Sequence, residues 1–128
     1  MPEWRWVSRD AALSAHLEQL AEHGGGEGVR DAGLLDSAMA RPQNLAAYGE
    51  PDAAALAASY AYGLACNHPF VDGYKRTALV VSELFLAKNG LRVKSGDAET
   101  LAIFLDLAAG EISEDELADW FRERISGR

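Results

Sequence analysis

Apolar residues recur along this chain at intervals of three and four, the spacing that places side chains on one face of an α-helix. Two stretches, residues 4–7 and 91–94, alternate like strands but are too short to stand alone, and they can pair with each other as a minor extended element. The pattern therefore predicts an all-α bundle of about six helices with minor extended segments. The predicted helices lie within residues 8–23, 31–41, 51–67, 74–88, 97–109 and 113–125.

Residues with known capping preferences mark the ends of several predicted helices. Ser8 and Asp31 are suited to accept backbone hydrogen bonds at the first and second helix starts. The run from Ser113 to Glu116 has the sequence of a capping box, in which a serine and a glutamate satisfy each other's backbone N–H groups. Pro42 is expected to stop the second helix, because the residue before a proline is disfavoured in helical conformation.

The helix predicted over residues 74–88 is expected to form the centre of the bundle. Between Ala78 and Leu86, apolar residues cover nearly its whole circumference, a pattern typical of a helix surrounded by other helices. Asn89 and Gly90 supply the left-handed turn that ends it.

Composition narrows the classes of function. The chain has 128 residues, 48% of them hydrophobic and 25% charged, as expected for one globular domain. Its net charge of −8 argues against a nucleic-acid-binding surface, which needs a basic face. No run approaches the roughly 18 apolar residues of a membrane span, and the first residues lack the features of a signal peptide. We therefore expect a cytoplasmic protein with no nucleic-acid or membrane partner.

The single cysteine, Cys66, cannot form an internal disulfide bond, which agrees with a reducing compartment. It precedes His68 by two residues, so a nucleophilic Cys–His pair is one interpretation. We favour a second interpretation, in which Cys66 only packs in the core, because a free cysteine at the end of an apolar helix usually behaves as a small hydrophobic residue.

Residues 67–76 concentrate titratable groups where a loop leads into a helix. A helix start exposes backbone N–H groups and carries partial positive charge, so it can receive an anion. Lys75 and Arg76 add two cations there, which predicts a phosphate-binding seat. His68 lies one loop away as a candidate base, with Asp72 between them as a candidate Mg²⁺ ligand. Phosphoryl or nucleotidyl transfer is the chemistry that uses all four groups.

The segment from His68 to Arg76, His-Pro-Phe-Val-Asp-Gly-Tyr-Lys-Arg, resembles the signature of the Fic/Doc superfamily. It is most similar to the Doc (death-on-curing) toxin branch, whose pattern is His-x-Phe-x-Asp-x-Asn-Lys-Arg followed by Thr-Ala-Leu. The resemblance implies a single Fic/Doc-type domain over residues 1–128, built around a central buried helix. The similarity continues outside the motif in residues 28–31, 34–35, 40–43, 89–90 and 109–113.

The resemblance implies a role for each polar residue of the motif. His68 would be the general base that takes the proton from a target hydroxyl. Asp72 would hold a Mg²⁺ ion that bridges the phosphates of ATP. Lys75 and Arg76 would neutralise phosphate charge, and Gly73 would let the backbone approach the anion. The implied cofactors are therefore ATP and Mg²⁺.

The two aromatic residues of the motif have different interpretations. Phe70 is interpreted as a packing anchor that fixes the loop. Tyr74 stands where the family has asparagine, and a phenol is bulkier than an amide and offers one hydroxyl in place of separate donor and acceptor groups. We expect Tyr74 to be part of the phosphate seat, to crowd it and to weaken the activity. An attenuating change, selected or engineered, and natural divergence are the alternative origins of this residue.

The other two histidines match nothing in the motif. The first helix is expected to bury the face with Leu13, Leu17 and Leu20, and His16 is placed on the flank of that face. His23 is expected at the helix end, where the helix dipole favours a cation. Neither histidine is interpreted as a ligand.

Lys75 bears on the type of reaction. Adenylylating members of the superfamily carry a glycine at this position, whereas the Doc branch has lysine and is understood to transfer the γ-phosphoryl group of ATP. The resemblance therefore implies a protein kinase that acts on a serine or threonine of a translation factor of the elongation factor Tu type. An adenylyltransferase is the alternative within the fold. A catalytically inactive binding module is the alternative that Tyr74 suggests.

The resemblance also constrains regulation. Many Fic proteins inhibit themselves through a helix with the sequence Ser/Thr-x-x-x-Glu-Gly, and this chain has no such segment. A cognate Phd-like antitoxin is therefore the expected partner and inhibitor. The groove of this chain that would receive the antitoxin is expected beside the first helices and residues 24–31. Residues 24–31 are rich in glycine, lack the spacing of a P-loop and are interpreted as a mobile connector.

Overall fold

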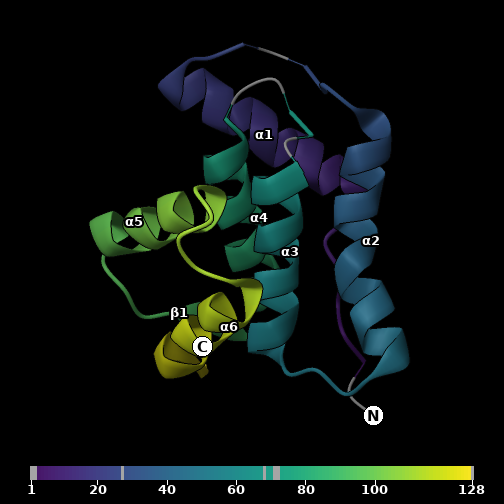
Figure 1. Ribbon diagram of the computed structural model, residues 1–128, viewed down its shortest axis with the longest axis vertical. Helices are drawn as coiled ribbons and strands as arrows, with labels where there is room; N and C mark the ends of the chain where they lie inside the picture. The colour runs from purple at the N-terminus through teal and green to yellow at the C-terminus, as the bar shows by residue number, and fades with distance from the viewer. Residues whose placement is uncertain (1–2, 27, 68, 71–72, 128) are drawn as a thin grey trace.

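Six α-helices and one short two-stranded sheet make up the part of the chain that the structure describes (Figure 1). The structure is a computed structural model and describes residues 3–26, 28–67, 69–70 and 73–127. The predicted all-α fold with minor extended segments is confirmed. In chain order the elements are α1 (Arg9–His23), α2 (Ala32–Tyr48), α3 (Ala53–Asn67), α4 (Tyr74–Lys88), β1 (Leu91–Val93), α5 (Asp97–Ala108), α6 (Glu114–Arg124) and β2 (Ile125–Gly127).

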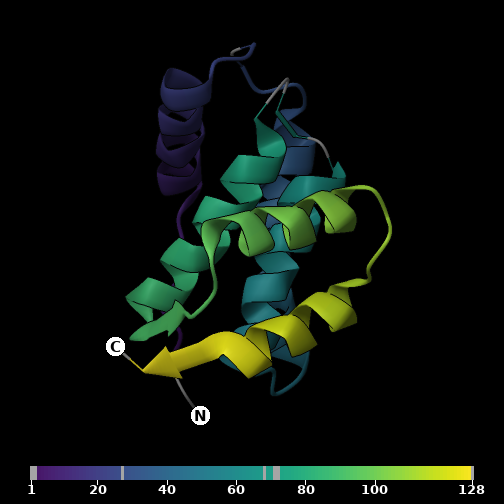
Figure 2. The same ribbon diagram turned by 90° about the vertical axis from the view of Figure 1, so that its left-hand side faces the viewer.

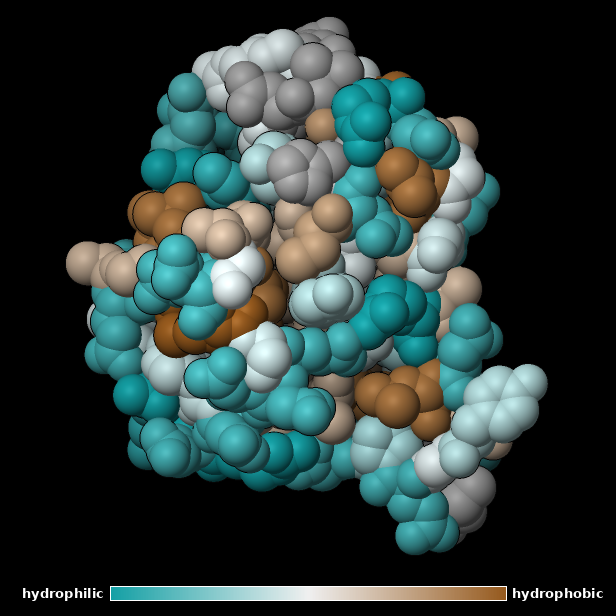
Figure 3. Space-filling model, in the orientation of Figure 1, coloured by the Kyte–Doolittle hydropathy of each residue, from teal (hydrophilic) through white to brown (hydrophobic). Residues whose placement is uncertain are grey.

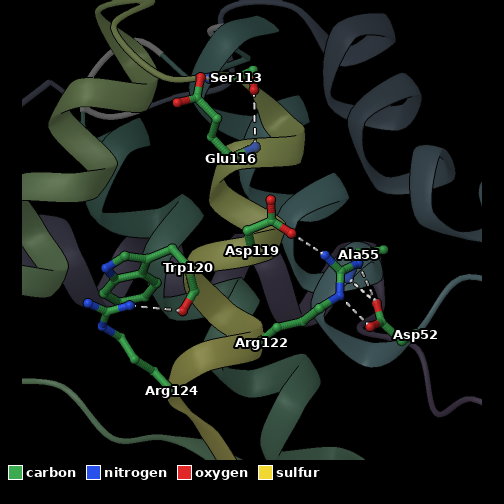
Figure 4. A network of polar contacts seen from close by, with 8 residues as sticks. All are labelled: Asp52, Ala55, Ser113, Glu116, Asp119, Trp120, Arg122 and Arg124. Atoms are coloured by element: carbon green, nitrogen blue, oxygen red, sulfur yellow. Dashed lines mark hydrogen bonds and ion pairs between the residues drawn. The ribbon is translucent and has the colours of Figure 1, made fainter.

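The predicted helix caps are present. Ser8 and Asp31 each accept, through a side-chain oxygen, the backbone N–H three residues later at 3.0 Å. Ser113 and Glu116 form the reciprocal capping box, with side-chain to backbone distances of 3.0 and 3.1 Å (Figure 4). Gly90 follows α4 with a φ of 79°, the expected left-handed turn. Each such cap is worth about 1 kcal/mol, so local chemistry sets these helix ends.

The centre of the bundle is α3, and the prediction that α4 occupies it is wrong. Helix α3 packs against α2, α4, α5 and α6 (Figure 1, Figure 2). Helix α4 packs against α1, α3, α5 and β1 but leaves Glu83 and Lys88 exposed. More than half of the residues of α3 are alanine or glycine, so neighbouring helices approach it closely from several sides. Its buried residues are Ala54, Leu56, Ala57, Ala58, Ser59, Tyr60, Ala61, Gly63, Leu64 and Ala65.

Helix α2 continues through Pro42 to Tyr48, so the predicted stop before Pro42 is wrong. Proline removes a hydrogen-bond donor from the helix, but Pro42 is buried and packing compensates for the loss. At the crossing of α2 and α3, a Cβ atom added to Gly63 would lie 3.0 Å from Ala38 Cα and 3.2 Å from Arg41 Cδ. This close approach packs the turn of α2 just before Pro42 directly against α3.

Strand β1 pairs with β2, and not with the N-terminal segment as predicted. The strands are antiparallel, with Leu91 opposite Gly127 and Val93 opposite Ile125. Because β2 follows α6 directly, the last turn of α6 delivers it to β1. Ile125 therefore lies half-buried in a strand, where the sequence pattern predicts the end of a helix.

The N-terminal segment runs alongside the end of α4 instead. The Asn89 side chain accepts the Arg5 N–H and donates to the Arg5 carbonyl oxygen, both at 3.0 Å. The rings of Trp4 and Trp6 lie 6.0 and 5.8 Å from that of Phe85. These contacts take the place of the predicted strand pairing.

Arg122 joins α6 to the start of α3 (Figure 4). It donates to both carboxylate oxygens of Asp52, at 2.6 and 3.0 Å, and to Asp119 at 2.7 Å. Asp52 also accepts the Ala55 N–H at 2.9 Å at the start of α3. The hydrogen bond from Arg122 lowers the pKa of Asp52. The side chains of Arg122 and Asp52 are 45% and 51% exposed, so the pair contributes at most about 1 kcal/mol.

Hydrophilic side chains cover much of the face seen in Figure 3, with smaller apolar patches between them. None of the helices in the described part of the chain is long and apolar enough to cross a membrane. The large hydrophobic residues that are exposed among the described residues are Leu17, Val29, Leu45, Tyr48 and Leu105.

Candidate functional site

Helix α4 begins at Tyr74, where the sequence predicts it. The preceding residue, Gly73, has φ 73° and ψ 7°, the left-handed conformation that glycine adopts at little cost. Its carbonyl oxygen accepts the Thr77 N–H at 3.0 Å and closes the first turn. Because a helix start carries partial positive charge, this turn forms an end of the helix that an anion can approach.

A cavity of about 680 Å³ opens at this helix start. Lys75 and Arg76 line it together with Gly73 and Tyr74, as the prediction of a phosphate seat requires. The volume falls in the range of small-molecule sites, and the mixture of cations and leucines suits a ligand with charged and apolar parts. The other lining residues come from α1, the loop after it and α5: Gln19, His23, Gly24, Gly25, Leu101 and Leu105.

A larger cavity of about 740 Å³ lies away from the motif. Trp4 and Trp6 line it with the end of α2, and its charged residues are Glu3 and Glu50. Carboxylates repel phosphate, whereas the smaller cavity holds the cations of the motif. We therefore assign the functional site to the smaller cavity.

Tyr74 lines the cavity beside Lys75. Its side chain is partly buried and packs against the hydrophobic core. Lys75 Nζ lies 5.6 Å from the centre of the Tyr74 ring, within the range of a cation–π contact. A phosphate group would have to compete with the ring for this ammonium group. The contact supplies a physical basis for the predicted crowding of the seat.

His68 and Asp72, the predicted base and Mg²⁺ ligand, lie outside the described residues. In the sequence they belong to the connection between α3, which ends at Asn67, and α4, which begins at Tyr74. Their roles remain predictions. Other residues of this connection are described, and their contacts reveal how it is held.

Residues 29–31 bind the connection between α3 and α4 (Figure 2). Val29 forms an antiparallel bridge with Phe70, and the backbone N–H groups of Arg30 and Asp31 donate to the Pro69 carbonyl oxygen at 2.7 and 3.2 Å. The Arg30 guanidinium also donates to the carbonyl oxygen of the last residue of α3 at 3.0 Å. The interpretation of the whole stretch before α2 as a mobile connector is therefore wrong for these three residues.

Phe70 is the packing anchor that the sequence predicts, with 1% of its surface exposed. The His16 ring stacks on it, with ring centres 3.9 Å apart and planes inclined by 9°. His16 is 2% exposed and Leu17 is 56% exposed, so the prediction that α1 buries Leu17 and carries His16 on its flank is wrong. The spacing contains the missed signal, because His16 lies three residues after Leu13 and four before Leu20.

Gln19 and His23 are cavity residues that the motif does not contain. His23 lies at the end of α1, as predicted, with its Nε2 3.7 Å from the Glu22 carboxylate. Together with Lys75 and Arg76 it lines the cavity, so the site includes an imidazole that the sequence interpretation left out. Helical periodicity could not reveal this, because the packing of α1 against α4 joins residues far apart in the chain.

An adjoining cavity of about 490 Å³ shares four lining residues with the functional cavity of about 680 Å³: Gln19, His23, Arg76 and Leu101. Glu83 and Asp97 also line it. Although Glu83 is exposed as a whole, partial desolvation of its carboxylate in this cavity raises its pKa, and the charge of Asp97 raises that pKa further. The cationic seat therefore borders a region of negative charge, with Arg76 common to both.

Cys66 lacks the environment of a nucleophile. Its Sγ lies 3.9 Å from the Leu107 carbonyl oxygen, and the side chain is partly buried. Burial raises the pKa of the Cys66 thiol, and the charge of Arg41 opposes this only in part. A thiol with a raised pKa is protonated at neutral pH and weakly nucleophilic, which disfavours the Cys–His pair.

Replacing Gly73 with alanine is expected to destabilise the protein by about 1–2 kcal/mol, the cost of a left-handed conformation for a residue with a side chain. The added Cβ would also lie 3.2 Å from Leu20 Cδ2. Unfolding in urea would measure the loss. Gly96→Ala is the control, because Gly96 has a φ of −71° and open space around the Cβ position. An unchanged unfolding midpoint for Gly73→Ala would contradict this description of the turn.

Comparison with known proteins agrees with the resemblance carried by the motif. The model of the Fic/DOC family matches residues 6–86. "Protein kinase doc" of Escherichia phage P1 is 35% identical over 120 residues, which cover 92% of this chain and 94% of the phage protein. "Toxin Doc" of Mycolicibacterium smegmatis is 47% identical over 73 residues, which cover 55% of each chain. The family match includes the motif and the cavity walls from α1 and α4.

Proposed function

Because the chain belongs to the Fic/DOC family, we propose that it is a Doc-type toxin of a toxin–antitoxin pair. Its proposed activity is transfer of the γ-phosphoryl group of ATP to a serine or threonine hydroxyl of a translation factor of the elongation factor Tu type. The names of the two relatives, a protein kinase and a toxin, support this proposal. The observation that carries it is the cavity of about 680 Å³ that Lys75 and Arg76 line at the start of α4.

The cavity residues have complementary roles in the proposed complex with ATP. Lys75 and Arg76 compensate the charge of the phosphates, and the backbone at Gly73 allows their close approach. Leu101 and Leu105 offer apolar contact to the rest of the nucleotide. Positioning and charge compensation are the main contributions that a protein makes to phosphoryl transfer.

Asp72 is the residue proposed to hold Mg²⁺. Within the described residues, no group of three or more His, Cys, Asp or Glu side chains could hold a metal ion. We propose that an ion here takes one carboxylate from the protein and its other ligands from phosphate oxygens and water. This is the usual mode of Mg²⁺ at nucleotide sites, so a motif with a single aspartate fits it. When bound, the ion would neutralise charge on the phosphates.

His68 is the proposed general base. It takes the proton from the target hydroxyl as the hydroxyl oxygen forms a bond to the γ-phosphorus. The bond between the γ-phosphorus and the oxygen that bridges it to the β-phosphate breaks, and ADP leaves. The products are ADP and a phosphorylated serine or threonine.

Adenylyl transfer is the alternative reaction for the same cavity. It would bring the α-phosphate to the target hydroxyl and release pyrophosphate. Lys75 favours phosphoryl transfer, since it replaces the glycine of adenylylating relatives. A binding module without catalysis is the third alternative, and it predicts no transfer of either phosphate.

A Phd-like antitoxin is the proposed partner. Leu17 on α1 is 56% exposed, and Val29 in the loop that binds the motif connection is 37% exposed. An amphipathic segment that folds on binding would cover such side chains and would stabilise the folded protein. The segment would also lie close to the connection that carries His68.

Induction of the chain in bacteria tests the proposed function. Induction alone is expected to slow growth and protein synthesis, and co-expression of the genomic neighbour is expected to relieve the arrest and protect residues 24–31 from proteases. The measurements are growth, incorporation of labelled amino acids and the melting temperature of the purified toxin with its neighbour. Equal toxicity with and without the neighbour would contradict the proposal that the neighbour encodes an antitoxin. If neither the chain nor its Tyr74→Asn variant arrested growth, the proposal that the chain is a toxin would be wrong.

A further inference from the structure

We infer that His16, a residue outside the motif, is a positioning residue that fixes the motif connection and the start of α4. The inference rests on the proposed function, because it assigns His16 a part in that reaction. It depends on three contacts of one buried ring, each with a different point of the chain between residues 70 and 77.

The first contact is the stack on Phe70. The two rings lie nearly parallel, with centres 3.9 Å apart, and their residues are 2% and 1% exposed. Phe70 is also held from its backbone side by the bridge to Val29. Phe70 is thus held by α1 through its side chain and by the loop after α1 through its backbone.

The second contact is with the left-handed turn. A Cβ atom at Gly73 would lie 3.7 Å from His16 Cε1 and 3.8 Å from His16 Nδ1, so the imidazole lies directly against this residue. Gly73 has no Cβ atom, so these distances show that the ring occupies the space beside the turn. It limits where the turn into α4 can move toward α1.

The third contact is with Thr77, in the first turns of α4. His16 Nδ1 lies 3.3 Å from Thr77 Oγ1, and Thr77 is completely buried. The Thr77 N–H already bonds to the Gly73 carbonyl oxygen, so the helix does not need the side-chain contact to form. What the contact adds is a polar tie between α1 and the turn that carries Lys75 and Arg76.

These contacts together bracket the segment that contains Asp72 and the cations of the seat. A leucine or phenylalanine at position 16 could fill the space, but neither could interact with the Thr77 hydroxyl. An error of about 1 Å in the placement of a reacting group can cost on the order of a hundredfold in rate. A residue that fixes both ends of the segment is therefore expected to affect turnover without touching ATP.

Four substitutions separate the stack from the polar tie. His16→Phe keeps an aromatic ring and loses the nitrogen, and His16→Asn keeps a polar group and loses the ring. Thr77→Val loses the hydroxyl at constant shape, and Thr77→Ser keeps the hydroxyl. The measurements are kcat and KM for ATP in transfer to purified elongation factor Tu, together with amide hydrogen exchange across the chain.

His16→Phe and Thr77→Val are each expected to lower kcat by about tenfold, part of the range that misplacement can cost. KM for ATP should change less than kcat, because neither His16 nor Thr77 is among the residues that line the cavity. The double variant should lose no more than either single one, since both remove the same tie. Thr77→Ser should retain most of the turnover, and His16→Asn should fall below the parent because it loses the stack.

Amide exchange gives a result that does not depend on activity. Exchange in His16→Phe and Thr77→Val should become faster at residues 30–31 and 74–77 and stay unchanged in α6. If the unsubstituted chain transfers no phosphate, the proposed function fails, and exchange still decides the role of His16. Unchanged exchange at these residues, or full turnover by Thr77→Val, would show that the ring only fills space and would overturn the inference.

Discussion

Replacing His68 with alanine is expected to reduce phosphoryl transfer by about 10²- to 10⁴-fold, the range typical of a lost general base. Without the imidazole, no group of the motif is available to take the proton from the target hydroxyl. The fold should remain, because the sequence places His68 in the connection between two helices and outside their apolar faces. Transfer of γ-labelled phosphate to elongation factor Tu measures the rate, and thermal unfolding measures the stability.

Tyr48→Ala is the control for this experiment, because Tyr48 is 91% exposed at the end of α2, away from the cavity. It should leave both rate and stability close to those of the parent. If His68→Ala instead lost more than about 3 kcal/mol, as on deletion of a core side chain, His68 would be a structural histidine. Unchanged transfer by the alanine variant would remove His68 from the mechanism.

Replacing Tyr74 with asparagine is expected to raise the transfer rate by about 10- to 100-fold, the range that a displacement of about 1 Å can cost. The Tyr74 ring lies 5.6 Å from Lys75 Nζ and lines the same cavity. In the Tyr74→Asn variant no ring lies beside the Lys75 ammonium group, and the asparagine amide offers both a donor and an acceptor to the loop and the phosphate. The rate is measured as above, with growth after induction as a second readout.

Tyr74→Phe is the matched control for this change. It keeps the ring beside Lys75 and loses only the hydroxyl, so its rate should stay close to that of the parent. The asparagine variant should unfold more easily, by about 1 kcal/mol, because Tyr74 packs against the core. If the parent already arrests translation as fast as the asparagine variant, Tyr74 is a tolerated residue and attenuation is wrong.

The parts of the fold that follow from local chemistry are predictable from the sequence. Ser8, Asp31 and the capping box beginning at Ser113 cap helices as predicted, because a cap depends on residues a few positions apart. Phe70 anchors the motif connection, and α4 begins directly after Gly73. The motif also identifies the cations of the cavity. All of these signals lie within short stretches of chain.

The parts that depend on contacts between distant segments are not predictable in this way. The sequence pattern predicts α4 as the centre of the bundle because of its large apolar residues. The observed centre is α3, because its small alanine side chains let neighbouring helices pack closely. Pro42 remains helical because α3 supports α2, and β1 pairs with the strand that α6 delivers. His16 is buried because its imidazole stacks on the Phe70 ring and lies within hydrogen-bond distance of the Thr77 hydroxyl. Helical spacing indicates the burial of His16, but no local pattern predicts the other three outcomes.

We propose above that this cavity supports transfer of the γ-phosphoryl group of ATP to a hydroxyl of a protein target. The most direct test incubates the chain, and its Tyr74→Asn variant, with purified elongation factor Tu and ATP labelled on either the α- or the γ-phosphate. We expect label on a serine or threonine of the target from γ-labelled ATP alone, and at least about a hundredfold less label from the His68→Ala variant. Label from α-labelled ATP would show adenylyl transfer and contradict the proposed kinase activity. No label from either form would contradict both reactions and favour a binding module.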